Sequence, residues 1–129
     1  MSMGKQGFTR IKGTQAVFVV EEWGRRYVRF SWRVRMSTSW GVWKRERVMG
    51  GRGCAAAISE DAAFAADFER AVYGLSRGRR VLVIGVALLG LAIARAGKIA
   101  SFAPGECYRA YEEACVEIYR EMVAGGYEA

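Results

Sequence analysis

The side chains best suited to chemistry in this sequence are the cations concentrated between residues 25 and 47. A guanidinium group presents a planar fork of donors that matches a phosphate or a carboxylate, so a row of arginines predicts the binding of a polyanion. Aromatic rings among the arginines could stack on unpaired bases. The candidate residues for binding nucleic acid or another polyanion are Arg25, Arg26, Tyr27, Arg29, Arg33, Arg35, Trp43, Lys44, Arg45 and Arg47.

The distribution of charge supports this choice of residues. The chain carries a net charge of +7, yet residues 24–53 hold nine bases and one acid, a net charge of +8. Residues 54–129 hold eight bases and ten acids and are slightly acidic. This asymmetry favours nucleic acid or an acidic protein surface as the partner. The alternative is that the charge only keeps a solvated surface from aggregating.

Other kinds of site find little support in the sequence. Histidine is absent, which excludes Ser–His and Cys–His nucleophile pairs and a histidine general base. The three cysteines, Cys54, Cys107 and Cys115, are widely spaced and include no C-x-x-C pair, so no structural zinc site is expected. Because an odd number of cysteines fits a reducing compartment, we expect a cytoplasmic protein.

Carboxylates and glycines give no catalytic motif either. Two acidic pairs, Glu21–Glu22 and Glu60–Asp61, could act as acids, bases or magnesium ligands, but no motif selects them. The glycine-rich segment 50–53 lacks the Gly-Lys-Ser/Thr end of a phosphate-binding loop, and we interpret it as a connector. We therefore expect a protein that is not an enzyme, needs no cofactor or metal, and takes no small-molecule substrate.

The element expected to display the basic residues is a strand over 26–36. Apolar residues hold its even positions and polar or basic residues hold its odd positions, which is the period of a β-strand with one buried face. If this face is buried, the substitution Trp32→Ala should cost roughly 3–5 kcal/mol. The face would place five residues in the core: Val28, Phe30, Trp32, Val34 and Met36.

Two further strands complete the expected sheet. The β-branched run at 15–22 is predicted to form a hairpin with 26–36 through a turn at Gly24. Residues 40–49, which include two tryptophans, are predicted to form the third strand. Basic strands that contain tryptophan and precede an alanine-rich helix are similar in topology to small DNA-binding modules with a three-stranded sheet.

The C-terminal half is predicted to be helical. Apolar residues recur at helical spacing over 59–76 and 104–123. Residues 81–94 are apolar all round, and a third helix is expected over 81–96. This last stretch is short for a membrane span, so a buried helix is favoured. A strand at 81–86 and a membrane-associated segment at 81–100 are the alternatives.

Together these elements predict one α+β domain over 1–129. A partly flexible N-terminus at 1–14 would precede a basic antiparallel sheet of three to four strands within 15–49. Two to three helices within 54–124 would pack on the apolar face of this sheet.

The expected function is a small binding module that engages nucleic acid through the basic, aromatic-containing face of the sheet. One alternative is a protein-binding adaptor or inhibitor that targets an acidic or nucleic-acid-binding partner. A homodimer is also compatible with a basic region and an acidic helix on the same chain.

Overall fold

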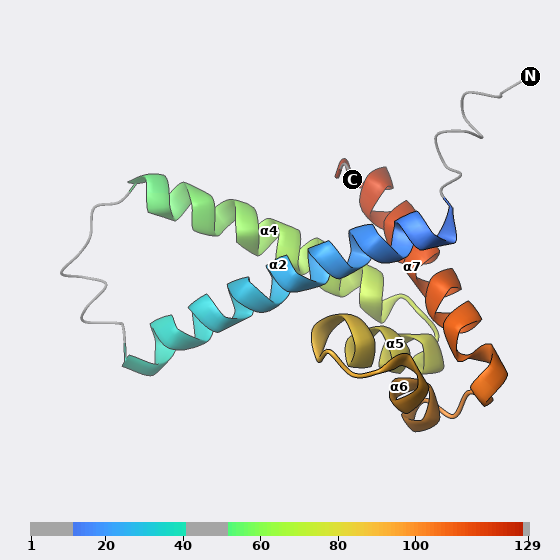
Figure 1. The fold of residues 1–129 in the computed structure, drawn as a ribbon. Coiled ribbons are helices and arrows are strands. Elements are labelled where there is room, and N and C mark those ends of the chain that lie inside the picture. The colour runs from blue at the N-terminus through green and yellow to red at the C-terminus, as the bar shows by residue number, and fades with distance from the viewer. Residues whose placement is uncertain (1–11, 41–51, 128–129) are drawn as a thin grey trace, which may run out of the picture.

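The computed structural model describes residues 12–40 and 52–127, and Figure 1 shows their arrangement. Within these two ranges the protein is helical and has no strand. The elements are α2 (Gly13–Trp40), α4 (Arg52–Tyr73), α5 (Arg77–Val83), the π-helix η1 (Ile84–Leu88), α6 (Ile93–Ile99), the 3-10 turn η2 (Pro104–Glu106) and α7 (Cys107–Ala124).

The predicted α+β class is therefore wrong for the described part of the chain. Residues 15–22 and 26–36, which were expected to pair as strands, are successive turns of the single helix α2. The third expected strand at 40–49 lies outside the described residues except for Trp40, the last residue of α2. The expected N-terminal segment 1–14 is described only from residue 12 onward.

A stripe of apolar residues explains why this segment is helical. Ala16, Val20 and Trp23 are buried, and Tyr27 packs against them from one side. These four residues are three or four positions apart, so a helix places them on one side, whereas a strand would divide them between two faces. A helix also satisfies its backbone groups within the segment, and no proline interrupts α2. The segment thus buries its apolar stripe without a partner strand.

The predicted buried face of residues 26–36 is wrong for the same reason. Residues two apart point in nearly opposite directions on a helix, so alternate residues cannot share one core. Trp32 is 59% exposed and Val34 is also exposed, while Val28 and Phe30 are half-buried. The side chain of Met36 lies outside the described part of the structure.

The two long helices α2 and α4 pack together near the smaller helices and extend away from them toward Trp40 and Arg52 (Figure 1). The smaller helices form a base, in which α7 contacts α4, α5 and α6. The N-terminal half of α2 lies across this base and packs against α7 and η1. One side of α2 is therefore covered by the base, and the opposite side is open.

The core lies where α2, α4, α5 and α7 meet. Phe64 and Phe68 stack with ring centroids 5.8 Å apart, and Trp23 stacks on Tyr119 at 6.0 Å. Burying one large apolar side chain contributes about 1.5–3 kcal/mol, so this cluster gives the surface above it a rigid support. The largest fully buried side chains are Tyr111, Phe64, Phe68, Leu82, Ile118, Met122, Val20, Val83 and Cys115.

Two of the three predicted C-terminal helices are confirmed. The helix expected at 104–123 is α7 with its preceding turn η2, and it ends at Ala124, just before Gly125. The helix expected at 59–76 is α4, which begins earlier than predicted. Proline in the first turn and apolar residues at helical spacing were reliable signals here.

The third predicted helix, at 81–96, is divided in two. α5 continues into η1, the chain turns through Gly90, whose φ is +73°, and α6 follows in the opposite direction along the same base. The alternative of a strand at 81–86 is wrong, because these residues are helical. Among the described residues, no helix combines the length and the apolar character needed to cross a membrane.

Glycines allow the helices around η1 to approach each other closely. A Cβ atom on Gly24 would lie 3.0 Å from the carbonyl oxygen of Ala87. A Cβ atom on Gly85 would lie 2.9 Å from the Cβ of Ala96. Because a glycine has no side chain to separate the backbones, α2 rests directly on η1, and η1 rests directly on α6. These contacts fix the position of α2 relative to η1.

Candidate functional site

The structure describes the side chains of only some predicted binding residues. Arg25, Arg26, Tyr27, Arg29 and Arg33 all lie on α2. Arg35 belongs to the same helix, but its side chain lies outside the described part of the structure. The remaining four predicted residues, Trp43, Lys44, Arg45 and Arg47, lie outside the described residues.

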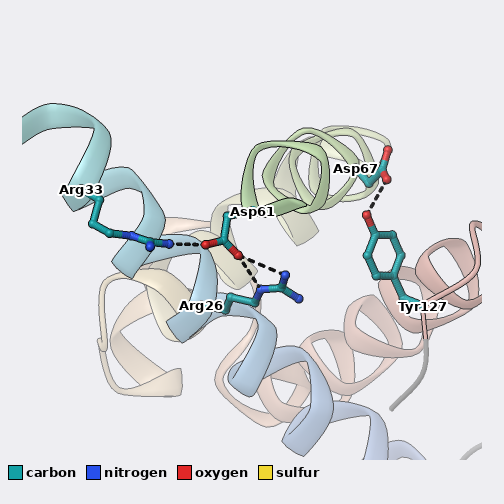
Figure 2. A network of polar contacts seen from close by, with 5 residues as sticks. All are labelled: Arg26, Arg33, Asp61, Asp67 and Tyr127. Carbon is teal, nitrogen blue, oxygen red and sulfur yellow. Dashed lines mark hydrogen bonds and ion pairs between the residues drawn. The ribbon is translucent and has the colours of Figure 1, made fainter. Parts of the chain in front are cut away.

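Two of these arginines are used to hold α2 against α4. Arg26 donates hydrogen bonds of 3.1 and 3.3 Å to Oδ1 of Asp61, and Arg33 donates to Oδ2 of the same carboxylate (Figure 2). The guanidinium of Arg26 also lies 4.1 Å from the ring centroid of Phe64. The hydrogen bond from Arg33, with a further one from Arg26, lowers the pKa of Asp61. Both arginines are thereby partly neutralised and held in place.

Tyr27 also has a structural role. Its hydroxyl donates a hydrogen bond of 2.5 Å to Glu69 on α4, and its ring lies 5.5 Å from the ring of Phe68. Burial, followed by the hydrogen bond to Glu69, raises the pKa of Tyr27 to about 12, so the phenol keeps its proton at neutral pH. These contacts hold the half-buried ring of Tyr27 against α4.

The other two arginines, Arg25 and Arg29, are exposed on α2. Arg25 forms an exposed ion pair of 2.5 Å with Glu22, one turn earlier on the same helix. Arg29 is exposed and has no hydrogen-bond or ionic partner among the described residues. Because exposed pairs such as Arg25–Glu22 are weak, both guanidinium groups can be reoriented toward a ligand at little cost.

These arginines adjoin a groove that we name the α2–η1 groove. It consists of two neighbouring hollows of about 420 and 460 Å³, which share Val28, Leu88 and Leu89 as lining residues. The first hollow is mainly apolar and is also lined by Tyr27, Ser31, Trp32 and Ile84. The second is also lined by Glu21, Arg25, Arg29, Val86, Ala87 and Gly90.

Two large apolar side chains on the walls of this groove remain in solvent. Trp32 on α2 is 59% exposed, and Leu89, the residue after η1, is 68% exposed. Exposed tryptophan and leucine side chains that flank one hollow form an apolar patch, and such patches mark binding sites more often than isolated apolar residues do. The α2–η1 groove therefore has an apolar half around Trp32 and Leu89, and an end that carries Arg25 and Arg29.

The floor of the groove is formed by η1 and the turn that follows it. Ile84 and Leu88, which line the groove, are the first and last residues of η1 and lie about one turn apart on it. The wider turn of η1 ends where the amide of Leu89 donates to the carbonyl of Ile84 at 3.0 Å. Gly90 then reverses the chain with its positive φ, which leaves Leu89 at the rim.

Glu21 is the acid in the lining of the groove, and it is already engaged. The hydroxyl of Tyr111 on α7 donates a hydrogen bond of 2.8 Å to its Oε2. Of the other predicted carboxylates, Glu22 pairs with Arg25, and Asp61 pairs with Arg26 and Arg33. Within the ranges that the structure describes, no group of three or more acidic or cysteine side chains could hold a metal ion.

Sequence reasoning missed half of this groove. It selected the arginines of α2, but it did not select Ile84, Leu88 or Leu89, which lie in a uniformly apolar run. Such a run shows which residues avoid water but not which of them remain exposed, because that depends on where neighbouring helices end. The position of Leu89 directly before Gly90 was the available signal, because glycine marks a turn and turns run over the surface of a protein.

The chain was also compared with known proteins. Neither the protein-family models, nor the curated proteins, nor the solved structures gave a match to it.

Proposed function

We propose that this protein is a non-enzymatic docking module whose α2–η1 groove binds an acidic, amphipathic helix of a partner protein. The observation that carries the proposal is the exposure of Trp32 and Leu89 on the walls of one apolar groove. Beside them lies Arg29, which has no ionic partner among the described residues. The proposal develops the sequence-based expectation of a protein-binding adaptor with an acidic partner. It places the site in the groove between two helices and not on a sheet.

The apolar half of the groove would supply most of the affinity. Burying an exposed leucine or tryptophan contributes about 1.5–3 kcal/mol for each side chain. Tryptophan and arginine are also the residue types that most often dominate protein–protein interfaces. Trp32 and Leu89 lie on opposite elements, so an apolar ridge placed between them would contact both.

The arginine end of the groove would select the sign of the partner's charge. Arg29 lacks an ionic partner among the described residues, and Arg25 has only an exposed one. The sequence around them, residues 24–53, carries a net charge of +8. Carboxylates on the partner would therefore be attracted from a distance and would pair with these guanidinium groups once bound.

A helical partner fits this site better than an extended one does. Extended peptides are usually bound by adding a strand to the edge of a sheet, and the described residues contain no sheet. A groove between two helices accepts the apolar face of an amphipathic helix, with anchors at i, i+3, i+4 and i+7. The partner should therefore carry leucine-like residues on one face and acidic residues beside them.

Nucleic acid is a less suitable occupant for this groove. The sheet on which that prediction depended is absent from the described residues, and Arg26, Tyr27 and Arg33 are engaged with α4. A charged phosphate backbone would also leave the apolar side chains of Trp32 and Leu89 exposed to water. As part of the proposal we retain a cytoplasmic location, to which the two buried, unpaired thiols Cys107 and Cys115 are suited.

A binding titration tests the proposal. The probe is a synthetic, fluorescently labelled helix of leucine, alanine and glutamate, with leucines on one face and glutamates on the other. The control probe is a peptide of the same composition in scrambled order, which cannot form the apolar face. We expect fluorescence anisotropy to show saturable binding of the amphipathic peptide and weaker binding of the scrambled one.

Variants then locate the site. Leu89→Ala should weaken binding about tenfold, which corresponds to the loss of about 1.4 kcal/mol of apolar contact. Arg29→Ala should weaken it several-fold at low salt and less at high salt. Phe18→Ala is the matched control, because Phe18 is an equally exposed residue of α2 outside the groove lining. Equal affinity for both peptides, or binding of duplex DNA and not of the peptide, would contradict the proposal.

A further inference from the structure

A second basic surface lies on the helical base, away from α2. The chain from Arg70 to Gly105 contains six bases and no acid, and this part includes the whole of α5, η1 and α6. No other part of the described chain is free of acids over such a length. This excess of positive charge is local and does not include the arginines that border the α2–η1 groove.

Half of these bases are already used within the fold. Arg79 pairs with Glu113 at 2.7 Å and with Glu117 at 2.9 Å on α7, and Arg70 pairs with Asp67 at 3.0 Å. The guanidinium of Arg80 lies 5.1 Å from the ring centroid of Tyr73 and is half-buried. These three side chains are therefore held by the protein itself.

The other three bases are left to the solvent. Arg77, Arg95 and Lys98 are exposed and have no hydrogen-bond or ionic partner among the described residues. Arg95 and Lys98 are three residues apart on α6, so they lie on the same face of that helix. The opposite face of α6 holds Ala96 and Gly97, which are buried.

Contacts between helices bring Arg77 to the same part of the base. Gly85 in η1 faces Ala96 in α6, with a Cβ on the glycine 2.9 Å from the alanine Cβ. Gly78 in α5 faces Phe102 and the carbonyl of Ala100, just after α6. The two segments therefore run antiparallel, and Arg77, at the start of α5, lies near the end of α6 that carries Lys98.

We propose that this α6 surface, formed by Arg77, Arg95 and Lys98, binds the phosphate backbone of a nucleic acid duplex. The three cations are exposed on helices that pack against each other, so the backbone holds them on one part of the base. Arginine and lysine are the side chains that most often neutralise phosphates. The proposal does not depend on the α2–η1 groove, since none of the three residues lines it.

The surface suits a phosphate backbone better than a protein or a membrane. No residue of α6 lines the α2–η1 groove, so the three cations are separate from the apolar walls described above. Helices that insert into a bilayer surface carry a row of large apolar residues. The outer face of α6 instead has a small residue, Ala94, beside the two cations, and Ile99 is its one exposed large apolar side chain.

The experiment measures the binding of a labelled, short DNA duplex to the full chain at several salt concentrations. Each phosphate neutralised contributes a slope of about −0.9 to the plot of log K against log salt. The double substitution Arg95→Ala with Lys98→Ala should make that slope less steep by about 2 units. The control double substitution, Lys12→Ala with Arg120→Ala, removes one lysine and one arginine that are exposed elsewhere and have no ionic partner among the described residues. It should change the slope less.

Three results would overturn the proposal. They are the absence of duplex binding at low salt, an equal loss of slope in both double variants, and binding to phosphatidylserine vesicles without binding to the duplex. The variants should fold, because both replaced side chains are exposed, and a thermal melt by circular dichroism verifies this. Peptide binding in the α2–η1 groove should be unchanged in the Arg95 and Lys98 variant, so the two proposals can fail separately.

Discussion

Tyr111 on α7 and Glu21 on α2 are joined by a hydrogen bond of 2.8 Å, although they are 90 residues apart in the chain. The ring of Tyr111 is fully buried, and its hydroxyl reaches the carboxylate that lines the arginine end of the α2–η1 groove. Burial raises the pKa of Tyr111, so its hydroxyl remains a donor across the whole physiological range. The pair links the position of α2 to the base and keeps Glu21 turned toward α7.

The substitution Tyr111→Phe removes this donor and keeps the ring. Because a hydrogen bond to a charged group is worth about 1.5–3 kcal/mol, we expect the free energy of unfolding to fall by about that amount. Urea denaturation measures the change. Tyr108→Phe is the matched control on the same helix, since Tyr108 is exposed and should lose less than about 0.5 kcal/mol. Equal stability of both variants would show that the Tyr111–Glu21 bond does not anchor α2.

Two aromatic positions separate the observed fold from the expected one. Phe68 is fully buried, so Phe68→Ala should destabilise the protein by about 3–5 kcal/mol. Trp32 is mostly exposed, so Trp32→Ala should cost less than about 1 kcal/mol in stability while it weakens peptide binding. Thermal melts and the peptide titration test both statements. A loss of several kcal/mol of stability in Trp32→Ala would show that Trp32 is buried, as the predicted apolar face of 26–36 requires.

The error over residues 26–36 has a physical explanation. Alternation of apolar and polar residues satisfies a strand, but Tyr27 and Ser31, on the polar side of that pattern, are four apart and face the base in the helix. The longer apolar stripe that begins at Ala16 and Val20 explains why the segment is a helix, because it packs the first half of α2 against the base. The helices at 104–123 and 59–76 could be predicted, since their apolar stripes coincide with the buried residues.

The site could be predicted only in part. The concentration of positive charge identified α2 as a binding element, but which arginines remain available depends on contacts with distant residues. Asp61 forms ion pairs with Arg26 and Arg33. The sequence around these arginines does not indicate that a carboxylate from α4 will pair with them. The exposure of Leu89 could not be predicted either, because it depends on the turn at Gly90 and on the distance between η1 and α2.

Asp61 gives the protein a measurable dependence on pH. The arginines lower its pKa in the folded state, so its contribution is present above the pKa of the unfolded chain, about 4, and is lost as the pH falls through the lowered folded value. Asp61→Asn should therefore reduce stability by about 1 kcal/mol at neutral pH. The difference from the wild type should shrink in acid, when both proteins carry a neutral side chain at this position.

Denaturation of both proteins across a pH series checks this expectation. The substitution Glu60→Gln provides the control, because Glu60 is the exposed neighbour and makes no contact with Arg26 or Arg33. A constant difference between wild type and Asp61→Asn from neutral pH down to strong acid would show that ionisation of Asp61 is not the cause.

Gly97 tests how tightly α6 packs against α7. A Cβ at this position would overlap the Sγ of Cys107 and lie 2.9 Å from its Cβ. Although alanine favours a helix over glycine by about 1 kcal/mol, we expect Gly97→Ala to destabilise the protein by about 1–3 kcal/mol through this overlap. Adding Cys107→Ala should recover part of the loss, which a double-mutant cycle by urea denaturation would measure. Stabilisation by Gly97→Ala alone would contradict the close contact.

The central claim, that the α2–η1 groove is the docking site, is tested most directly by mapping the bound peptide onto the protein. Isotope-labelled protein is titrated with the amphipathic leucine–glutamate peptide, and chemical-shift changes are followed by nuclear magnetic resonance. We predict that the largest changes occur at the Trp32 indole and at the amides of Arg29, Leu88 and Leu89. Changes that cluster around Arg95 and Lys98 on α6, or that are absent from the groove, would contradict the claim.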